Sequence, residues 1–558
     1  MPVPTPFRID EALWPELSSR MKKVLFTGCS APVTVVASCL LMFTVAARAD
    51  VRLPAVFSDN MVLQQGVPVT VWGFADEGEE VTVQFQGQSV KATAFKQLPN
   101  PASRWKLRLA PLKASATPDV FTVSGKNKLE RKNVLVGEVW IASGQSNMEF
   151  GLRSSHESQP DMDAANLPLI RLFTVPRAKL TAPADDVKAS WQVCSPQSVQ
   201  NFSAVAFYFG RDLHAALKVP IGLIHTSWGG TPAEAWTSQS SIEGNAELRR
   251  DFVEKFANAQ NIYADAVKKY YAEAEELKKK GQKPAAPAPK APAPPPTWRG
   301  AELYNGMIAP LVPYAIKGAI WYQGEANASR FGQYRVLFPE MIKGWRKAWE
   351  QGDFPFLAVQ LAPWDKSRKR SLEEITAAAE ESDWARLREV QVQTAQALPN
   401  YGLAVITDVG DKDDIHPTKK RPVGARLALA ARAIAYGEKI SYAGPAFKAM
   451  NVQGEKAVLS FEHVGAGLEA RGGKLTGFAV CGADKKFVPA DAELRADQTI
   501  AVSAPTVKQP VAVRFGWADF PVVNLFNKDG LPASPFRTDT FPPLPPPAPP
   551  GKPAPAKK

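Results

Sequence analysis

Two stretches of the chain, 50–133 and 441–540, consist of short apolar runs broken by glycines and polar residues. In the first stretch, VTVW (69–72) and VTVQF (81–85) are rich in β-branched residues and are separated by a segment with two glycines. This pattern is typical of β-strands joined by turns. We therefore predict a small β module in each of the two stretches.

Apolar runs of a different kind occur between these modules, over 134–440, and helical segments separate them. The runs are VLVGEVWIA (134–142), VPIGLIHT (219–226), IKGAIWY (316–322), FPFLAVQL (354–361) and GLAVITD (402–408). Apolar residues recur at helical spacing in 202–217 and in 334–349. Strands of this buried type that alternate with helices are typical of a parallel sheet covered on both faces. We therefore predict a three-layer α/β/α core.

An insertion at 246–298 interrupts this alternation. Its first part, 246–280, is a highly charged helix candidate, and a run of Pro, Ala and Lys follows at 281–296. A run of this composition is extended and semi-rigid. Two interpretations stay open, a solvated helix on a tether and a lid over the functional site.

The two ends of the chain differ in composition from the parts predicted to fold. Residues 1–49 have the features of a leader that starts at Met21: a basic segment, a short apolar run and an Ala-x-Ala cleavage pattern. The Pro- and Lys-rich tail 541–558 is predicted to be disordered. We therefore expect an exported protein, periplasmic or extracellular, with no integral membrane segment after leader removal. It would retain Cys194 and Cys481, either as a disulfide or as two buried thiols.

The composition and the distribution of charge bear on whether the partner is a nucleic acid. Apolar residues make up 45% of the 558 residues and charged residues 22%, which is ordinary for a chain with sizeable cores. The formal net charge is +12, but more than half of this excess falls in the leader, the Pro-rich stretch and the tail. A nucleic-acid-binding protein concentrates basic charge on a folded face. The charge distribution therefore argues against nucleic acid as a partner.

Polar or glycine-rich clusters follow four of the five predicted strands. They are SGQSNM (143–148), SWGGT (227–231), QGEAN (323–327) and DVGDKDDIHP (408–417). In open parallel sheets, ligand-binding and catalytic groups gather at the carboxyl ends of the strands. The four clusters together indicate a functional site at this edge of the sheet.

These clusters contain the groups that acyl transfer requires. Ser146 would lie at the start of a helix, and a serine nucleophile needs a nearby base such as His416. A carboxylate completes a triad by fixing the histidine tautomer. Asp413 lies three residues before His416, and Asp411 and Asp414 compete with it for this role. Glycine N–H groups and a side-chain amide would bind the developing oxyanion.

Each cluster taken alone has a simpler interpretation. A Gly-x-Ser turn is usually only a turn, and a histidine before a helix is commonly a cap or a surface residue. A rival nucleophile, Ser227, lies in the segment HTSWG (225–229), which is close to the pattern Gly-x-Ser-x-Gly. In this rival, His225 stands where the first glycine belongs and would crowd the turn.

Five ordered motifs resemble the sialate O-acetylesterase family of SGNH-type hydrolases. The motifs are GQSNMEF (144–150), SWGGTPAEAW (227–236), LYNGMIAPL (303–311), IWYQGEANA (320–328) and DIHP (414–417). The resemblance extends over 51–540 and implies an SGNH-hydrolase-like parallel sheet with flanking β-sandwich-type modules. It also implies a secreted serine esterase that removes acetyl groups from sugar hydroxyls and uses neither a metal nor another cofactor.

The resemblance also implies roles for single residues. Ser146 would be the nucleophile and His416 the base. The oxyanion hole would consist of the backbone N–H groups of Ser146 and Gly229 and of the side chain of Gln323. Asn327 is an alternative to Gln323 as the third oxyanion donor.

Two further roles follow from the same motifs. The acid of such a triad usually lies three residues before the histidine, which is Asp413 here, but the Asp-Ile-His match leaves Asp414 open. Trp228 and Asn327 are candidate substrate-binding residues, because they lie within the matched motifs.

We therefore predict a carbohydrate O-acetylesterase with a Ser-His-Asp acyl-enzyme mechanism. The substrate would be an acetylated sialoside or an acetylated plant polysaccharide such as xylan or xyloglucan. The carboxylate of a sialic acid would need a cationic partner, for which Arg153, Arg330 and Arg388 are candidates. The alternatives are a non-catalytic secreted glycan-binding protein and a glycoside hydrolase that uses Glu325 and an aspartate.

Overall fold

The computed structural model describes residues 50–96, 103–284, 286–290, 297–367, 369–377, 379 and 381–542. The predicted leader lies outside this part of the chain, and so does the predicted tail beyond residue 542. Within the described residues, no helix combines the length and the apolar character that crossing a lipid bilayer requires.

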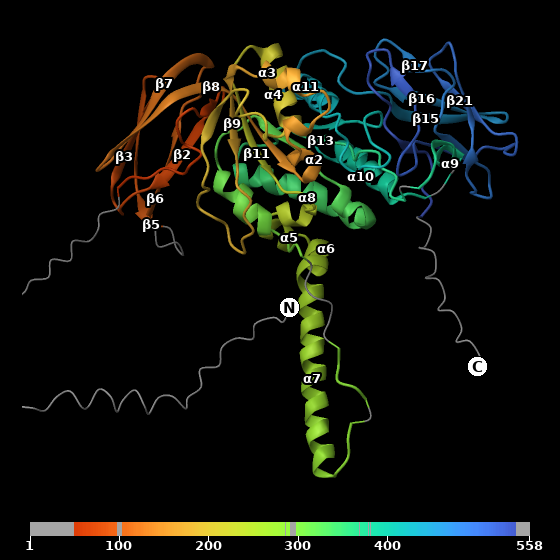
Figure 1. Ribbon diagram of the computed structural model, residues 1–558, viewed down its shortest axis with the longest axis horizontal. Coiled ribbons are helices and arrows are strands. Elements are labelled where there is room, and N and C mark those ends of the chain that lie inside the picture. The colour runs from red at the N-terminus through yellow and green to blue at the C-terminus, as the bar shows by residue number, and fades with distance from the viewer. Residues whose placement is uncertain are drawn as a thin grey trace, which may run out of the picture. The chain divides into compact units, whose positions relative to one another are not determined.

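The central sheet has the strand order β10-β9-β11-β8-β12-β13-β14 (Figure 1). Its strands are β8 (Lys128–Gly144), β9 (Leu167–Thr174), β10 (Trp191–Cys194), β11 (Ile221–Ser227), β12 (Gly318–Tyr322), β13 (Phe356–Val359) and β14 (Tyr401–Ala404). All neighbouring pairs are parallel except β10 and β9. β11, β12 and β13 are buried along their whole length, which explains their continuous apolar sequences. The predicted α/β sheet is confirmed, and β9 and β10 extend it beyond the predicted strands.

Helices cover both faces of this sheet. They are α4 (Ala204–Leu217) and α11 (Arg421–Tyr436) on one face, and α8 (Phe331–Trp349) and α10 (Asp383–Ala397) on the other. Successive residues of a strand point to opposite faces of a sheet. Accordingly, Trp140 and Ala142 of β8 pack with the first pair of helices, whereas Val139 and Ile141 lie in the hydrophobic cluster that contains α8.

Shorter helices connect these elements. They are α2 (Ser146–Glu149), α3 (Gln159–Asp163), α5 (Gln239–Gly244), α6 (Ala246–Arg249), α9 (Leu372–Ala377) and the 3-10 turn η7 (Glu325–Arg330). Two of them, α2 and η7, directly follow strands of the central sheet. They therefore present their first residues at its carboxyl edge.

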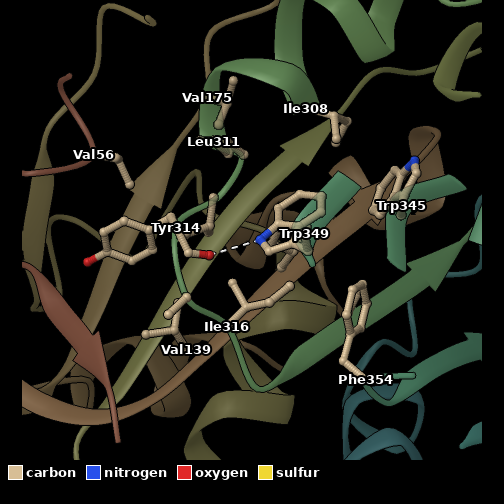
Figure 2. Close-up of a cluster of buried hydrophobic side chains, with 14 of the residues drawn as sticks. Val56, Val139, Val175, Ile308, Leu311, Tyr314, Ile316, Trp345, Trp349 and Phe354 are labelled. Carbon is tan, nitrogen blue, oxygen red and sulfur yellow. Dashed lines mark hydrogen bonds between the residues drawn. The ribbon is translucent and has the colours of Figure 1, made fainter. Parts of the chain in front are cut away.

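The N-terminal strands form a β module that continues into the central sheet. They are β1 (Val62–Gln64), β2 (Val69–Phe74), β3 (Glu80–Phe85), β4 (Gln88–Thr93), β5 (Phe95–Lys96), β6 (Ser103–Leu109) and β7 (Ser115–Ser124). The first part of β8 pairs with β7 and β1, and its last part lies between β11 and β12. Figure 2 shows the shared core, where the Trp349 indole N–H donates to the carbonyl oxygen of Tyr314 (2.8 Å) near Val56 and Val139. The module thus has no separate core.

The C-terminal strands form a second β region with a hydrophobic cluster of its own. They are β15 (Ala446–Gln453), β16 (Lys456–Glu462), β17 (Leu468–Ala470), β18 (Phe478–Cys481), β19 (Val488–Pro489), β20 (Asp491–Leu494), β21 (Ile500–Ser503), β22 (Ala512–Phe515), β23 (Leu525–Asn527) and β24 (Phe536–Arg537). All their mutual pairings are antiparallel. The predicted additional β-sheet modules are therefore present.

The charged insertion is helical, as predicted. The π-helical turn η4 (Arg250–Glu254) leads into α7 (Lys255–Lys279), which extends away from α5 and α6 (Figure 1). After the Pro-rich connector the chain returns to the rest of the protein, where Trp298 packs against Trp228 with ring centroids 5.0 Å apart. This arrangement corresponds to a solvated helix on a tether and does not place α7 over the strand ends.

Cys194 at the end of β10 and Cys481 at the end of β18 are buried and unpaired. Burial raises the pKa of the Cys194 thiol to about 12 and also raises the pKa of Cys481. Of the two alternatives left open by the sequence, the structure therefore contains the two buried thiols.

Candidate active site

Gly144 and Ser146 mark the point where β8 ends and α2 begins. Gly144 has a φ of +139°, and a Cβ at this position would lie 2.2 Å from the carbonyl oxygen of Tyr322 on β12. Glycine is therefore required for the close approach of the two strands. The turn places the Ser146 N–H in the first turn of α2, where backbone N–H groups have no partner within the helix.

Ser146 and His416 lie in contact, although 270 positions separate them in the sequence. The distance from His416 Nε2 to Ser146 Oγ is 2.9 Å. Burial lowers the pKa of His416, Asp414 opposes this shift, and the nearby ammonium of Lys420 lowers the pKa further. A histidine with a lowered pKa is neutral at neutral pH, so it can accept a proton from the serine.

One of the three candidate carboxylates faces the His416 ring. Asp414 Oδ1 lies 3.6 Å from His416 Nδ1 and accepts a hydrogen bond from the His416 backbone N–H (2.8 Å). Asp411 accepts hydrogen bonds from the backbone N–H groups of Asp413 and Asp414 (2.9 and 3.1 Å), which forms a tight turn. In this turn Asp413 is directed to Lys412 Nζ (2.5 Å). The contacts therefore favour Asp414, the alternative left open, over the predicted Asp413.

The backbone N–H of Gly229 lies beside the serine, as predicted for an oxyanion donor. A Cβ on Gly229 would be 3.2 Å from Ser146 Cβ, which shows that the loop after β11 packs on α2. The Gly229 N–H donates to Glu149 Oε2 at 2.9 Å. Arg177 Nε donates to Oε1 of the same carboxylate, also at 2.9 Å. In the structure, the Gly229 N–H is thus already hydrogen-bonded to the carboxylate of Glu149.

Gln323 and Asn327 follow β12 and are fully buried. Gln323 Nε2 donates to Asn327 Oδ1 (2.7 Å) and to the carbonyl oxygen of Thr231 (3.3 Å). Asn327 Oδ1 also accepts from the Ala233 N–H (2.9 Å), and its Nδ2 donates to Glu234 (3.0 Å). Asn327 therefore ties the loop after β11 to the loop after β12. Both protons of Gln323 Nε2 are thus donated to these two loops, so the choice between Gln323 and Asn327 as the third oxyanion donor stays open.

Trp228 lies next to Gly229 and is half-buried. Its ring packs edge-to-face on Trp298, and the guanidinium of Arg177 lies 5.5 Å from its ring centroid. Exposed indole surface beside a nucleophile is suited to contact with a sugar. Trp228 therefore stays a candidate for substrate binding.

The rival serine Ser227 also pairs with a histidine. His225 Nε2 lies 2.6 Å from Ser227 Oγ, and both side chains are almost fully buried within the sheet. Burial lowers the pKa of His225 to about 4, with a contribution from the charge of Arg177. The buried Nδ1 of His225 has no hydrogen-bond partner, so no carboxylate orients this ring. The pair lacks the third member that Ser146 and His416 have in Asp414.

The comparisons with known proteins identify the family of the chain. A family model described as carbohydrate esterase, sialic acid-specific acetylesterase, matches residues 136–281 and 295–432. The sialate O-acetylesterases of Rattus norvegicus and Mus musculus are 30% and 29% identical over 526 and 523 residues, which is 86% of this chain and 93% of each relative. A solved structure of a carbohydrate acetylesterase from Xanthomonas citri is 37% identical, with a TM-score of 0.73, and covers 88% of this chain and 100% of that chain. The chain belongs to this esterase family.

Membership of the sialic acid-specific acetylesterase family identifies the protein as a carbohydrate acetylesterase and replaces the alternative of a non-catalytic glycan-binding protein. The match is interrupted at 282–294, within the Pro-rich connector. This connector is therefore an addition to the matched esterase sequence. Among the described residues, no group of three or more His, Cys, Asp or Glu side chains is placed to bind a metal ion.

Several residues around Ser146 and His416 were not found by sequence reasoning. Glu149 and Asn147 lie in the GQSNMEF motif, but no spacing rule assigned them a partner. Lys420 is fully buried, whereas its neighbour Lys419 is exposed. Nothing in a Lys-Lys pair before a helix distinguishes the buried member from the exposed one. Arg177 lies between β9 and β10, in a segment without a recognisable pattern.

Two of the three arginines suggested to bind a sialate carboxylate have other side-chain partners. Arg388 is fully buried and donates to four backbone carbonyl oxygens. Arg330 forms an ion pair with Glu234 (2.8 Å). Arg153 is exposed, and its backbone N–H donates to the carbonyl oxygen of Gln200. The cation next to the proposed oxyanion donor is Arg177, which the sequence did not single out.

Proposed function

We propose that this acetylesterase cleaves acetyl groups from sugar hydroxyls through an acyl-enzyme intermediate on Ser146. The observation that supports the proposal most directly is the 2.9 Å contact between Ser146 Oγ and His416 Nε2 at the carboxyl edge of the sheet. Both residues lie within the part of the chain that the family model matches. Asp414 would orient the His416 ring and stabilise the imidazolium that forms.

The reaction would proceed in two halves. In the first, His416 takes the proton of Ser146 while Oγ bonds to the acetyl carbonyl carbon. The imidazolium then protonates the sugar oxygen, the ester bond breaks, and the sugar leaves with its free hydroxyl. In the second half, His416 takes a proton from water, which bonds to the acetyl carbon. Acetate leaves, and Ser146 regains its proton.

The oxyanion of each tetrahedral intermediate would be bound by the backbone N–H groups of Ser146 and Gly229, and by Gln323 Nε2 once it leaves Asn327 or Thr231. Each such donor contributes about 3 kcal/mol to the transition state. The Gly229 N–H becomes available when the Glu149 carboxylate moves away. Arg177 would remain the hydrogen-bond partner of the displaced carboxylate.

The proposed substrate is an acetylated sialoside or an acetylated plant polysaccharide. Relatives named as sialate O-acetylesterases support the first class, and the relative named as a carbohydrate acetylesterase supports an acetylated carbohydrate in general. Trp228 offers an aromatic surface for a sugar ring of either class. The half-exposed Arg177 beside it offers a cation that a carboxylate on the sugar would meet.

Acetate release from both substrate classes, and hydrolysis of 4-nitrophenyl acetate, test the proposal. We expect the Ser146→Ala variant to lose activity by roughly 10³-fold or more, because no other group can form the acyl-enzyme. Ser154→Ala, an exposed serine close in sequence, is the matched control and should retain the wild-type rate. Equal rates for wild type and Ser146→Ala would overturn the assignment of the nucleophile.

A further inference from the structure

Three polar side chains, two of them fully buried, connect the helix of the nucleophile to the loop of the base. Asn147, next to Ser146, donates from Nδ2 to Glu325 Oε1 (2.6 Å) and to the carbonyl oxygen of Ile415 (3.0 Å). Lys420 Nζ donates to Asn147 Oδ1 (2.5 Å). Asn147 and Lys420 have no exposed surface. The three side chains come from three separate parts of the chain and meet only in the folded protein.

The two charged partners fix the Asn147 amide in one orientation. A lysine ammonium only donates hydrogen bonds, and an ionised carboxylate only accepts them. The amide oxygen must therefore face Lys420, and the amide nitrogen must face Glu325. The second proton on this nitrogen is then directed to the carbonyl of Ile415, the residue before His416. Asn147, which follows Ser146, is thus hydrogen-bonded to Ile415, which precedes His416.

Lys420 is a buried cation that surrounding groups stabilise. Its ammonium lies 4.8 Å from the ring centroid of Phe150 and 5.3 Å from that of Tyr322. Burial lowers the pKa of Lys420 to about 7, and the negative charges of Glu325 and Asp414 oppose this shift. Burial of an unpaired lysine destabilises the folded state. A buried lysine at this position therefore indicates a role that offsets this cost.

The charged groups that face His416 are Asp414, on its own loop, and Lys420, at the start of α11. From α2 the ring contacts the neutral hydroxyl of Ser146. Glu325, which follows β12, acts on Lys420 rather than directly on the histidine. A change of charge at Lys420 is therefore felt at His416.

We propose that Asn147, Glu325 and Lys420 are positioning residues of this esterase, which hold the His416 loop against Ser146. None of the three contacts the reacting atoms; they act through the amide of Asn147 and through the charge of Lys420. The inference rests on the proposed function, because the network has this purpose only if Ser146 and His416 react. A merely structural network would stabilise the fold without any effect on the pH profile.

The Lys420→Met variant, which keeps the length of the side chain and removes its charge, tests the electrostatic part. His416 must be neutral to accept a proton, so kcat/KM falls as the pH drops through the His416 pKa. In that range Lys420 is protonated, because its own pKa of about 7 lies higher. Loss of this positive charge makes protonation of His416 easier. We therefore expect the acid limb of the kcat/KM profile for 4-nitrophenyl acetate to move to higher pH.

The exposed neighbour provides the control. Lys419→Met removes a charge one residue away from the network and should leave the acid limb in place. Coincident acid limbs for Lys420→Met and wild type would overturn the electrostatic part of the proposal. A thermal unfolding curve for each variant shows whether the protein is folded at the assay temperature.

A second variant tests the positioning role even if Lys420→Met fails to fold. Asn147→Asp has nearly the same size, but its ionised side chain cannot donate to the Ile415 carbonyl or to Glu325. We expect kcat for 4-nitrophenyl acetate to fall by at least tenfold, with KM changed by less than about twofold, because misplacement of the base affects the chemical step. A wild-type kcat in this variant would overturn the positioning role.

The failure of this proposal can be told apart from the failure of the proposed function. Ser146→Ala reports on the reaction, and the network variants report on its geometry. If Ser146→Ala is inactive while Asn147→Asp and Lys420→Met behave like wild type, the proposed function stands and the network is only structural. If Ser146→Ala is as active as wild type, both are overturned.

Discussion

At the scale of single residues, Glu149 and a developing oxyanion would compete for the same donor. The Gly229 N–H gives its hydrogen bond to Glu149 Oε2, and Arg177 binds the other carboxylate oxygen. A carboxylate at this place would also repel the negative charge of a tetrahedral intermediate. In the proposed mechanism, turnover therefore requires Glu149 to leave Gly229, so this side chain would slow the reaction.

This competition predicts an increase in activity when the carboxylate is removed. In Glu149→Ala the Gly229 N–H is free, and we expect kcat/KM for 4-nitrophenyl acetate to rise by up to roughly tenfold. Glu157→Ala, which removes an exposed carboxylate elsewhere, should have no effect. A decrease in Glu149→Ala would contradict the prediction and would show that Glu149 is needed to hold the loop of Gly229 in place.

The pair of Ser146 and His416 could be predicted from the sequence, because polar clusters at the ends of parallel strands converge on one edge of a sheet. The carboxylate of the triad could not be assigned to one residue from the sequence. Asp413 and Asp414 differ by one position, and the capping of the turn by Asp411 decides which of them faces the ring. A side-chain hydrogen bond of this kind leaves no periodic signal.

At the scale of elements, the end of β8 determines where the nucleophile lies. Gly144 is paired with Ser227 of β11 on one side and with Tyr322 of β12 on the other. The strand was predictable from its long apolar run, and so were its two parallel neighbours. β9 and β10 were not predicted, because a proline and an arginine interrupt the apolar pattern of 167–174 and because tertiary pairing sets the edge of a sheet.

Gly144→Ala should therefore damage both the fold and the site. The new Cβ would lie 2.2 Å from the Tyr322 carbonyl oxygen, at a φ that side chains rarely adopt. We expect a loss of about 1–3 kcal/mol in the free energy of unfolding and a fall of roughly 10²-fold in kcat from displacement of Ser146. Chemical denaturation and esterase assays measure the two effects. Gly332→Ala, at a helix position with free space around it, should show neither.

At the scale of the whole molecule, the C-terminal β region is joined to the esterase core by buried polar contacts. Arg388 of α10 donates to Leu361 and Ala362 in the core and to Ala518 and Asp519 in the C-terminal region. Other hydrogen bonds cross the same junction, from Ser382 Oγ to Asp519 and from Gln360 Nε2 to Ser534. A residue that the sequence suggested for substrate recognition thus joins the two parts.

The polar contacts at this junction predict that the two parts unfold together. Arg388→Met would leave four carbonyl oxygens, two buried and two part-buried, without their charged donor. We therefore expect the free energy of unfolding to fall by about 3 kcal/mol and the C-terminal region to unfold before the core. Differential scanning calorimetry should then show two transitions where the wild type shows one. Arg335→Met, at a half-exposed position on α8, is the matched control and should keep the wild-type profile. An unchanged single transition in Arg388→Met would show that apolar packing alone joins the two parts.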